Sequence, residues 1–456
     1  MRLPAPGTSA TRAATMLDML FTTDAMRAVF GDAARVQRML DFEAGLARAE
    51  TIAGVIPASA ALSIVQCCRA DEFDFAALAR DARNAGNLAI PLVAALTRNV
   101  AAIDPEARGY VHWGATSQDA IDTGLVLQLR DALGLVARDL DRLAAALVLQ
   151  VRAHRDTAVV GRTWLQQAVP VTLGLKLAGV LSAVDRHRAR VASIRPRVAV
   201  LQFGGAAGTL ASLGARGIEV ETALAADLGL AVADTPWHTQ RDDLGEVASV
   251  MGLVTATLGK LARDVSLLAQ TEVAEAFEPA APGRGGSSTL PHKRNPVGAA
   301  AALAASVRVP NLVATMLAAA VQEHERGLGN WPAEWDTLPE IMMLAAGALD
   351  AMAGVVEGLD VKPERMRANL ELSQGQIFAE AVQMAAAPAL GRDTAHALVG
   401  AACKRAVAEG RHLRDVIRDE PQLAAVLDDA ALARLFDPQH YLGVSAAFID
   451  RALARH

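Results

Sequence analysis

The chain has 456 residues, of which 52% are hydrophobic and only 4% aromatic, and its formal net charge is -6 at pH 7. Acidic and basic residues are dispersed, so we expect no surface for a polyanion and exclude nucleic-acid partners. Alanine and leucine make up most of the hydrophobic residues, and this composition favours closely packed helices over β-sandwiches. A chain of this length predicts roughly two to four domains or one extended architecture.

The cysteines are odd in number and lack the spacing of metal ligands. Cys67, Cys68 and Cys403 therefore predict free, buried thiols in a reducing compartment. The first residues, 1–15, lack the apolar core of a signal peptide. No uncharged apolar run reaches the length of a transmembrane helix. We therefore expect a cytoplasmic protein without a membrane partner.

The N-terminal part of the chain reads as helices. Apolar residues at steps of three and four predict one helix over residues 16–56, ended by Pro57. Residues 60–103 predict two or three shorter helices. Their junction at 84–91 is rich in glycine, asparagine and proline, for which a surface turn is one interpretation.

Residues 110–119 gather a histidine, two hydroxyls and an acid around a glycine, immediately before a helical stretch at 120–155. Thr116 and Ser117 are natural caps for that helix. A helix N-terminus also favours carboxylates, so capping the helix and binding a carboxylate ligand are compatible roles.

Long helical patterns dominate the middle of the chain. A break at 161–170 precedes a helix over about 171–200, and 202–209 forms a glycine-rich loop whose spacing does not fit dinucleotide binding. Residues 237–242 open a helix whose apolar stripe continues without a break to Leu268. About 25 residues at 1.5 Å each span roughly 37 Å, which predicts an elongated helical bundle.

The last third begins with an alanine-rich helix at 298–322. Arg326, which follows it, suits a bidentate carboxylate clamp. No H-E-x-x-H motif is present, which argues against zinc. From residue 363 the helices shorten, as in a small accessory domain. The predicted domains are an N-terminal helical domain at 1–115, a central long-helix bundle at 116–362 and a C-terminal helical domain at 363–456.

The stretch with the most distinctive chemistry is 283–297, which packs glycines, serines and cationic residues between two prolines. Glycines let the main chain turn tightly and present N–H groups to an anion. Ser287 and Ser288 offer hydroxyls. Lys293 adds a positive point charge and Asn295 a two-sided hydrogen bonder. The stretch predicts a catalytic loop for a carboxylate or phosphate substrate, with a solvated linker as the alternative. The Walker spacing and the nucleophile elbow are both absent.

This loop also carries a family resemblance. Residues 286–296, G-S-S-T-L-P-H-K-R-N-P, resemble the signature G-S-S-x-M-P-x-K-x-N-P of the fumarase/aspartase superfamily, with only Leu290 in place of methionine. Residues 112–119 match the superfamily's H-x-G-x-T-S-x-D at every fixed position. The resemblance implies an all-α fold with an elongated central bundle of long helices, flanked by two smaller helical domains. It further implies a homotetramer whose active sites draw on three subunits, and no cofactor or metal.

The resemblance also implies the site residues. Ser287 would exchange a carbon-bound proton beside a carboxylate, while Lys293 and Asn295 stabilise the extra charge on that carboxylate. The sequence does not decide whether the serine or the lysine delivers the proton. The implied substrate-binding residues are His112, Thr116, Ser117, Trp164, Gln240, Arg241, Ser288 and Arg326.

Trp164 indicates the substrate. Adenylosuccinate lyases and their relatives usually carry a histidine after G-R-T, as the proton donor to the leaving group, whereas this chain reads G-R-T-W. A carboxylate leaves unprotonated and needs no donor. The stretches G-R-T-W-L-Q at 161–166, W-H-T-Q-R-D at 237–242 and Q-E-H-E-R at 322–326 resemble the 3-carboxy-cis,cis-muconate cycloisomerases. That resemblance implies intramolecular lactonisation of a small tricarboxylate in protocatechuate catabolism, the β-ketoadipate pathway.

Two alternatives stay open. The first keeps the fold and changes the substrate, to adenylosuccinate or to another substrate of a fumarate-releasing lyase, with His112 or His238 as the proton donor. The second is a non-enzymatic helical scaffold. The joint retention of Ser287, Lys293 and Asn295 argues against it.

Overall fold

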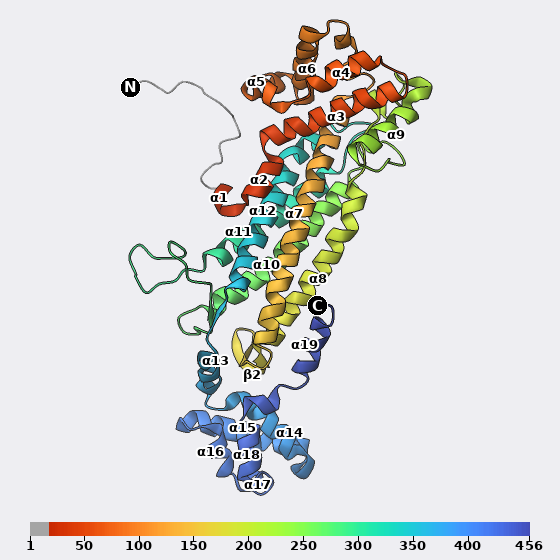
Figure 1. The fold of residues 1–456 in the computed structure, drawn as a ribbon. Helices are drawn as coiled ribbons and strands as arrows, with labels where there is room; N and C mark the ends of the chain where they lie inside the picture. The colour runs from red at the N-terminus through yellow and green to blue at the C-terminus, as the bar shows by residue number, and fades with distance from the viewer. Residues whose placement is uncertain (1–17) are drawn as a thin grey trace. The chain divides into compact units, whose positions relative to one another are not determined.

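The computed structural model describes residues 18–456, and helices account for most of them (Figure 1). The predicted all-α fold class is confirmed. The chain divides into two compact units whose boundaries fall inside long helices, and the division into three domains stays a prediction. The first unit takes the chain up to Asp141, His187–Gly259 and Ala301–Ala351, and the second takes Arg142–Arg186, Lys260–Ala300 and Met352–His456.

The single helix predicted over residues 16–56 is wrong, because the described part of this stretch forms three helices. Thr23 begins a new helix, since the amide of Met26 donates to its hydroxyl at 3.2 Å. Gly31 ends that helix and precedes the next one, because its backbone is extended, with φ -67° and ψ 158°. The three helices are α1 (Asp18–Phe21), α2 (Asp24–Phe30) and α3 (Asp32–Ile52).

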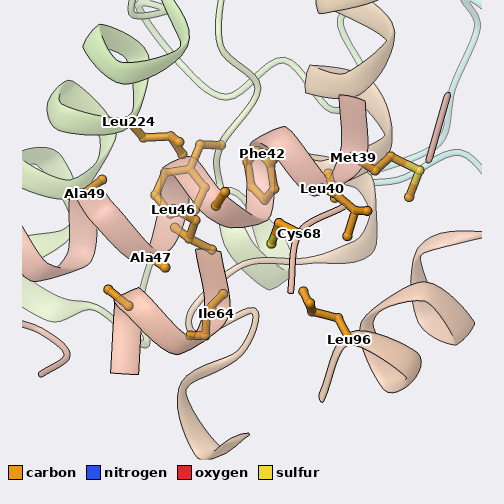
Figure 2. Packing of buried hydrophobic residues seen from close by; sticks show 14 of the residues in the cluster. Met39, Leu40, Phe42, Leu46, Ala47, Ala49, Ile64, Cys68, Leu96 and Leu224 are labelled. Atoms are coloured by element: carbon orange, nitrogen blue, oxygen red, sulfur yellow. The ribbon is translucent and has the colours of Figure 1, made fainter. Parts of the chain in front are cut away.

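The core of the first unit gathers around α3 (Figure 2). Phe42 and Leu46 of α3 are buried with Leu224 of α9, and each such side chain contributes about 1.5–3 kcal/mol. Cys67 and Cys68 are buried in the same cluster, as predicted, whereas the third cysteine is only half-buried. The neighbouring helices are α4 (Ala58–Gln66), α5 (Phe75–Ala85), α6 (Ala89–Ile103) and α9 (Gly217–Leu228). The short helices predicted over 60–103 are therefore confirmed.

Four of the five long helices follow the predicted apolar patterns, and the fifth, α12, was not predicted. On α10 the predicted stripe is buried, including Leu244, Val247, Met251 and Val265. This helix therefore packs along one apolar face, as its sequence indicates. The long helices are α7 (Ser117–Ala153), α8 (Leu173–Val198), α10 (Asp242–Leu268), α11 (Val297–Ala319) and α12 (Asn330–Glu357).

Within residues 18–456, α10, α11 and α12 are long and apolar enough to cross a membrane by length and composition alone. None is an uncharged run, since each carries charged residues such as Arg308 of α11. The most apolar window is 61% buried in α10 and 67% in α12, but only 28% in α11. Helix α11 therefore leaves apolar surface uncovered, including Val307 and Leu317.

The second unit adds a β-hairpin where the sequence showed only a break in helical pattern. Strands β1 (Ala158–Thr163) and β2 (Gln166–Thr172) pair antiparallel, with a register shift between Val160 and Arg162. A two-residue ladder joins β3 (Ala276–Phe277) to β4 (Asp360–Val361). The C-terminal helices are shorter, as predicted from residue 363. They are α13 (Pro363–Leu370), α14 (Ala379–Leu390), α15 (Arg392–Glu409), α16 (Leu413–Arg418), α17 (Pro421–Ala424), α18 (Asp429–Leu435) and α19 (Ser445–Leu453).

Candidate active site

The site residues implied by the sequence are distributed over the two units, and each group is described by itself. The first unit holds His112, Thr116, Ser117, Gln240, Arg241 and Arg326, and the second holds Trp164, Ser287, Ser288, Lys293 and Asn295.

His112 lies in the turn before α7 and pairs with a buried acid of α3. Its Nδ1 lies 2.6 Å from Oε1 of Glu43. Burial pulls the pKa of His112 down, but the charge of Glu43 and its hydrogen bond outweigh burial, so the pKa is raised. The turn requires Gly114, at φ 74°, because a Cβ there would lie 2.8 Å from the side chain of Leu213. Glu43 therefore favours the cationic form of His112, which attracts carboxylates.

Asp119, in the first turn of α7, fixes the segment that carries Thr116 and Ser117. Its carboxylate accepts the Thr116 amide at 3.0 Å and two amides of the glycine-rich loop 202–208 at 3.1 and 2.9 Å. Nε2 of His238 lies 2.7 Å from the same carboxylate. The hydroxyls of Thr116 and Ser117 make no hydrogen bond to any described residue. The predicted hydroxyl cap is thus not formed, and both hydroxyls are available to a ligand.

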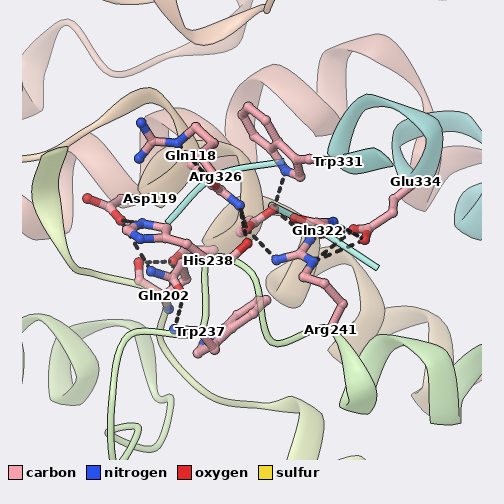
Figure 3. A network of polar contacts seen from close by, with 12 residues as sticks. Gln118, Asp119, Gln202, Trp237, His238, Arg241, Gln322, Arg326, Trp331 and Glu334 are labelled. Atoms are coloured by element: carbon pink, nitrogen blue, oxygen red, sulfur yellow. Dashed lines mark hydrogen bonds and ion pairs between the residues drawn. The ribbon is translucent and has the colours of Figure 1, made fainter. Parts of the chain in front are cut away.

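Arg241 is buried within the first unit between two carboxylates (Figure 3). Its guanidinium donates to Asp122 at 2.7 and 3.1 Å and to Glu334 at 3.0 and 3.1 Å. The indole of Trp331 also donates to Asp122, at 3.0 Å, and the amide of Gln322 donates to Glu334 at 2.9 Å. Burial lowers the pKa of Arg241, but the two carboxylates raise it by more. The network holds the guanidinium away from solvent.

Arg326 lies beside this network, and part of its guanidinium is not hydrogen-bonded (Figure 3). Its Nε donates to Oε1 of Gln118 at 2.9 Å and its Nη2 to the carbonyl of Ala206 at 3.3 Å. Gln118 is itself fixed, because its amide donates to the carbonyl of His238 at 2.8 Å. Nη1 of Arg326 remains available for an anion. Gln240 is exposed, and its side chain makes no hydrogen bond within residues 18–456.

In the second unit, the loop 283–297 folds back on itself. The main chains of Gly286 and Arg294 form an antiparallel bridge, and the amide of Asn295 donates to the carbonyl of Gly285 at 2.8 Å. Gly285, at φ 66°, is required because a Cβ would lie 2.4 Å from the carbonyl oxygen of Asn295. This closure fixes both ends of the turn that carries the serines and the lysine.

The reactive groups of this loop differ in how they are bonded. Oγ of Ser287 accepts the amides of Thr289 at 3.3 Å and of Leu290 at 3.0 Å. Two N–H donors stabilise negative charge on that oxygen. Ser288 and Lys293 are exposed, and their side chains bond to no residue in the described part of the chain. A hydroxyl that can carry charge and a free ammonium group therefore share one turn.

Glu278 anchors the base of the loop. Its carboxylate accepts the amides of Gly298 at 3.0 Å and Ala299 at 2.7 Å in the first turn of α11, where a helix favours an anion. Its carbonyl accepts Nη2 of Arg294 at 2.8 Å. The side-chain amide of Asn295 makes only a long contact, of 3.5 Å, with the carbonyl of Gly286.

Trp164 and Leu165 form the tip of the hairpin. Both adopt left-handed backbone angles, φ 53° and 64°, which are uncommon outside glycine, and they are 97% and 82% exposed. The hairpin is fixed close to this tip, because the guanidinium of Arg162, which pairs with Gln167, donates to Glu275 at 2.8 and 2.7 Å. Asn369 donates to the same buried carboxylate at 2.8 Å. The hairpin thus presents two large apolar side chains to solvent.

Asn87 and Gln167, whose roles the sequence left open, both have structural partners. Oδ1 of Asn87 accepts the amide of Ile90 in the first turn of α6 at 3.1 Å. The amide of Gln167 donates to the carbonyl of Asn369 at 3.1 Å. No group of three or more metal-ligating side chains occurs in the described part of the chain.

Sequence reasoning missed the buried acids that hold these segments, namely Glu43, Glu275 and Glu278. One of them left a signal. Glu43 occupies a position of the apolar pattern of α3 between Leu40 and Leu46, where a charged residue is out of place unless it is paired. The other two follow α10 without any periodic context.

Comparisons with known proteins show the family of the chain. A family model described as "Lyase" matches residues 19–311, and one described as "Adenylosuccinate lyase C-terminus" matches residues 375–452. The chain is 58% identical to a 3-carboxy-cis,cis-muconate cycloisomerase of Pseudomonas aeruginosa, over 97% of this chain and 96% of that protein. Its structure is similar to that of the 3-carboxy-cis,cis-muconate lactonizing enzyme of Pseudomonas putida, with a TM-score of 0.93, 55% identity, and 97% and 98% of the two chains covered. It is also similar to a fumarate lyase of Mesorhizobium sp. BNC1, with a TM-score of 0.89, 42% identity, and 96% and 99% covered.

Proposed function

Because the chain belongs to the lyase family of the fumarase/aspartase superfamily, we propose that this enzyme closes 3-carboxy-cis,cis-muconate to a carboxymuconolactone. The observation that carries the proposal is Trp164, which stands where related lyases carry the proton donor for a leaving group. Ring closure by a carboxylate, and its reversal, need no such donor, because a carboxylate is stable unprotonated. We place the reaction in the catabolism of protocatechuate.

The proposed reaction is an intramolecular anti addition. A carboxylate oxygen of the substrate forms a C–O bond to one carbon of a double bond, and the π electrons move to the adjacent carbon and onto its carboxylate. Lys293 and Asn295 stabilise the added charge on that carboxylate. A proton from Ser287 or Lys293 then completes the new C–H bond. The two amides that donate to Oγ of Ser287 support its role, because they stabilise the alkoxide that remains.

The other predicted residues bind the attacking carboxylate and the third carboxylate of the substrate. Thr116 and Ser117 offer free hydroxyls at the N-terminus of α7, where His112 adds a cation. Arg326 contributes its free Nη1, and Ser288 and Gln240 contribute exposed polar groups. We assign Arg241 a positioning role instead of direct contact, because its side chain is 1% exposed and paired with two carboxylates. No cofactor or metal is required by this scheme.

We also propose that the active sites are completed in a homotetramer, each drawing on three subunits. Trp164 and Leu165 at the hairpin tip, and the poorly buried face of α11, are apolar surfaces of the kind that a partner subunit covers. The chain mass is 47.7 kDa, and light scattering should give four times that value. A fully active monomer would refute this assembly. A cytoplasmic location is proposed as well, since free thiols persist in reducing compartments.

The test is direct turnover. We expect the purified protein to remove the ultraviolet absorbance of 3-carboxy-cis,cis-muconate, and Ser287→Ala to fold normally but lose that activity. Ser266→Ala is the matched control, because that hydroxyl only donates to the carbonyl of Arg263 in α10. Inactivity on 3-carboxymuconate together with turnover of adenylosuccinate would overturn the assignment.

A further inference from the structure

A cavity of about 410 Å³ lies within the first unit, and none of the catalytic or substrate-binding residues implied by the sequence lines it. Its walls come from α3, α5, the turn that follows α5, α7 and α12. Its volume falls in the range of pockets that hold small molecules. The proposed reaction leaves this cavity without a role.

Apolar side chains form most of the wall, including Met39, Leu88, Ile121 and Leu125. Such a surface stabilises a ligand in proportion to the apolar area that the ligand removes from water. An apolar body of a small molecule is therefore the natural filling.

The charge on the wall is of one sign. Of the described residues that line the cavity, Arg35 and Arg83 are cationic and none is acidic. Arg35 already has partners in the protein, because its Nη2 donates to the carbonyl of Trp335 at 3.2 Å and lies 3.9 Å from the carboxylate of Asp336. Arg83 makes no hydrogen bond or ion pair with any residue from 18 to 456. A free guanidinium at an apolar wall favours a ligand that carries a carboxylate.

A second donor at this cavity is also unsatisfied. Asn87 lines it, and its side-chain amide nitrogen remains available because only its oxygen is used, by the amide of Ile90. A guanidinium and an amide N–H together suit a carboxylate, which accepts several hydrogen bonds.

From these observations we propose that the cavity is a second ligand site, which binds a small carboxylic acid with an apolar body. The carboxylate pairs with Arg83 and accepts from the side-chain amide of Asn87, while the body packs against Met39, Ile121 and Leu125. The inference does not depend on the proposed reaction, because the cavity shares no residue with the machinery assigned to it.

The experiment is calorimetric titration of the whole protein with benzoate and with its neutral isostere benzamide. We expect benzoate to bind and benzamide to bind at least about tenfold more weakly, since hydrogen bonds to charged groups are the stronger ones. Arg83→Ala should weaken benzoate by at least about tenfold. Asn87→Asp, which keeps the acceptor for Ile90 but removes the donor, should weaken it by several-fold. Arg80→Ala, an exposed arginine of the same helix outside the lining, should change nothing.

Three results would overturn the proposal. They are no benzoate binding at millimolar concentration, equal binding of benzamide, and benzoate binding that Arg83→Ala leaves intact. The last result would place benzoate in another pocket, and competition with 3-carboxymuconate turnover would then locate it in the active site. Activity of the unliganded variants is a separate readout, so a failed titration leaves the proposed function standing.

Discussion

Glu50 of α3 is a buried acid without a partner, and we expect its replacement by glutamine to stabilise the fold. The residue is 0% exposed, and neither carboxylate oxygen has a hydrogen-bond partner among the described residues. Burial, and after it the charge of Glu43, raises the pKa of Glu50 from 4.5 to about 9. The folded protein therefore keeps Glu50 neutral at pH 7, whereas the unfolded chain ionises it. Glu50→Gln preserves the shape and removes the ionisation.

The sign and size of the stabilisation by Glu50→Gln follow from proton binding in the folded and unfolded states. Between pH 4.5 and about 9 the unfolded chain binds fewer protons than the folded one, so the free energy of unfolding falls as the pH rises. Each pH unit above 4.5 corresponds to about 1.4 kcal/mol. The loss due to Glu50 is thus about 3 kcal/mol at pH 7 and below about 1 kcal/mol at pH 5. Glu50→Gln should recover these amounts.

Thermal unfolding of the whole protein between pH 5 and pH 8 measures the effect. For a chain of 456 residues the entropy of unfolding is about 1 kcal/mol/K, so Tm should rise by roughly 3 °C at pH 7 and by less than about 1 °C at pH 5. Glu106→Gln, at an exposed residue without a side-chain partner among the described residues, should show no such trend. A gain in Tm that stays constant over this range, or shrinks as the pH rises, would refute the reasoning.

Three further substitutions test the pairs around the candidate site. Glu43→Gln removes the charge that raises the pKa of His112, so that pKa should fall. The alkaline limb of the pH–rate profile should then move to lower pH, and an unmoved limb would contradict the pairing. Arg162→Met leaves the buried carboxylate of Glu275 without its cation, which should lower the free energy of unfolding by about 3–5 kcal/mol. Chemical denaturation measures this loss, and an unchanged midpoint would argue against the role of the pair. Arg241→Met removes the cation that lowers the pKa of the buried Glu334, so its loss of stability should be larger at pH 7 than at pH 5, where Glu334 protonates more readily. A loss independent of pH would exclude this explanation.

The sequence was most informative where structure is decided locally. The apolar steps from Leu244 to Leu268 predicted a long helix with one buried face, and α10 has both properties. The two breaks in the predicted N-terminal helix were also local, at Thr23 before an aspartate and at Gly31 before another. Those breaks were missed because apolar periodicity was weighed above capping chemistry.

The sequence was least informative where partners are distant. His112 and Glu43 are separated by 69 positions, and Arg162 and Glu275 by 113. No spacing rule links residues that far apart, so both pairs emerged only from the folded chain. The hairpin at 158–172 was missed as well, because short β-branched runs such as Val159 and Val160 resemble an interrupted helix until their strand partners are known.

A common physical arrangement underlies the three segments assigned to the site. In each one the segment is held by a buried acid with several donors: Asp119 for the turn before α7, Glu275 for the hairpin and Glu278 for the loop at 283–297. A carboxylate satisfied by several N–H groups is rigid and costly to disturb. Ser287 accepts only two amides of its own turn, so its hydroxyl can be removed with little effect on stability. Stability and turnover should therefore separate: Ser287→Ala should lower turnover alone, whereas Glu278→Gln should lower both Tm and turnover, because the amide cannot accept at full strength from the first turn of α11.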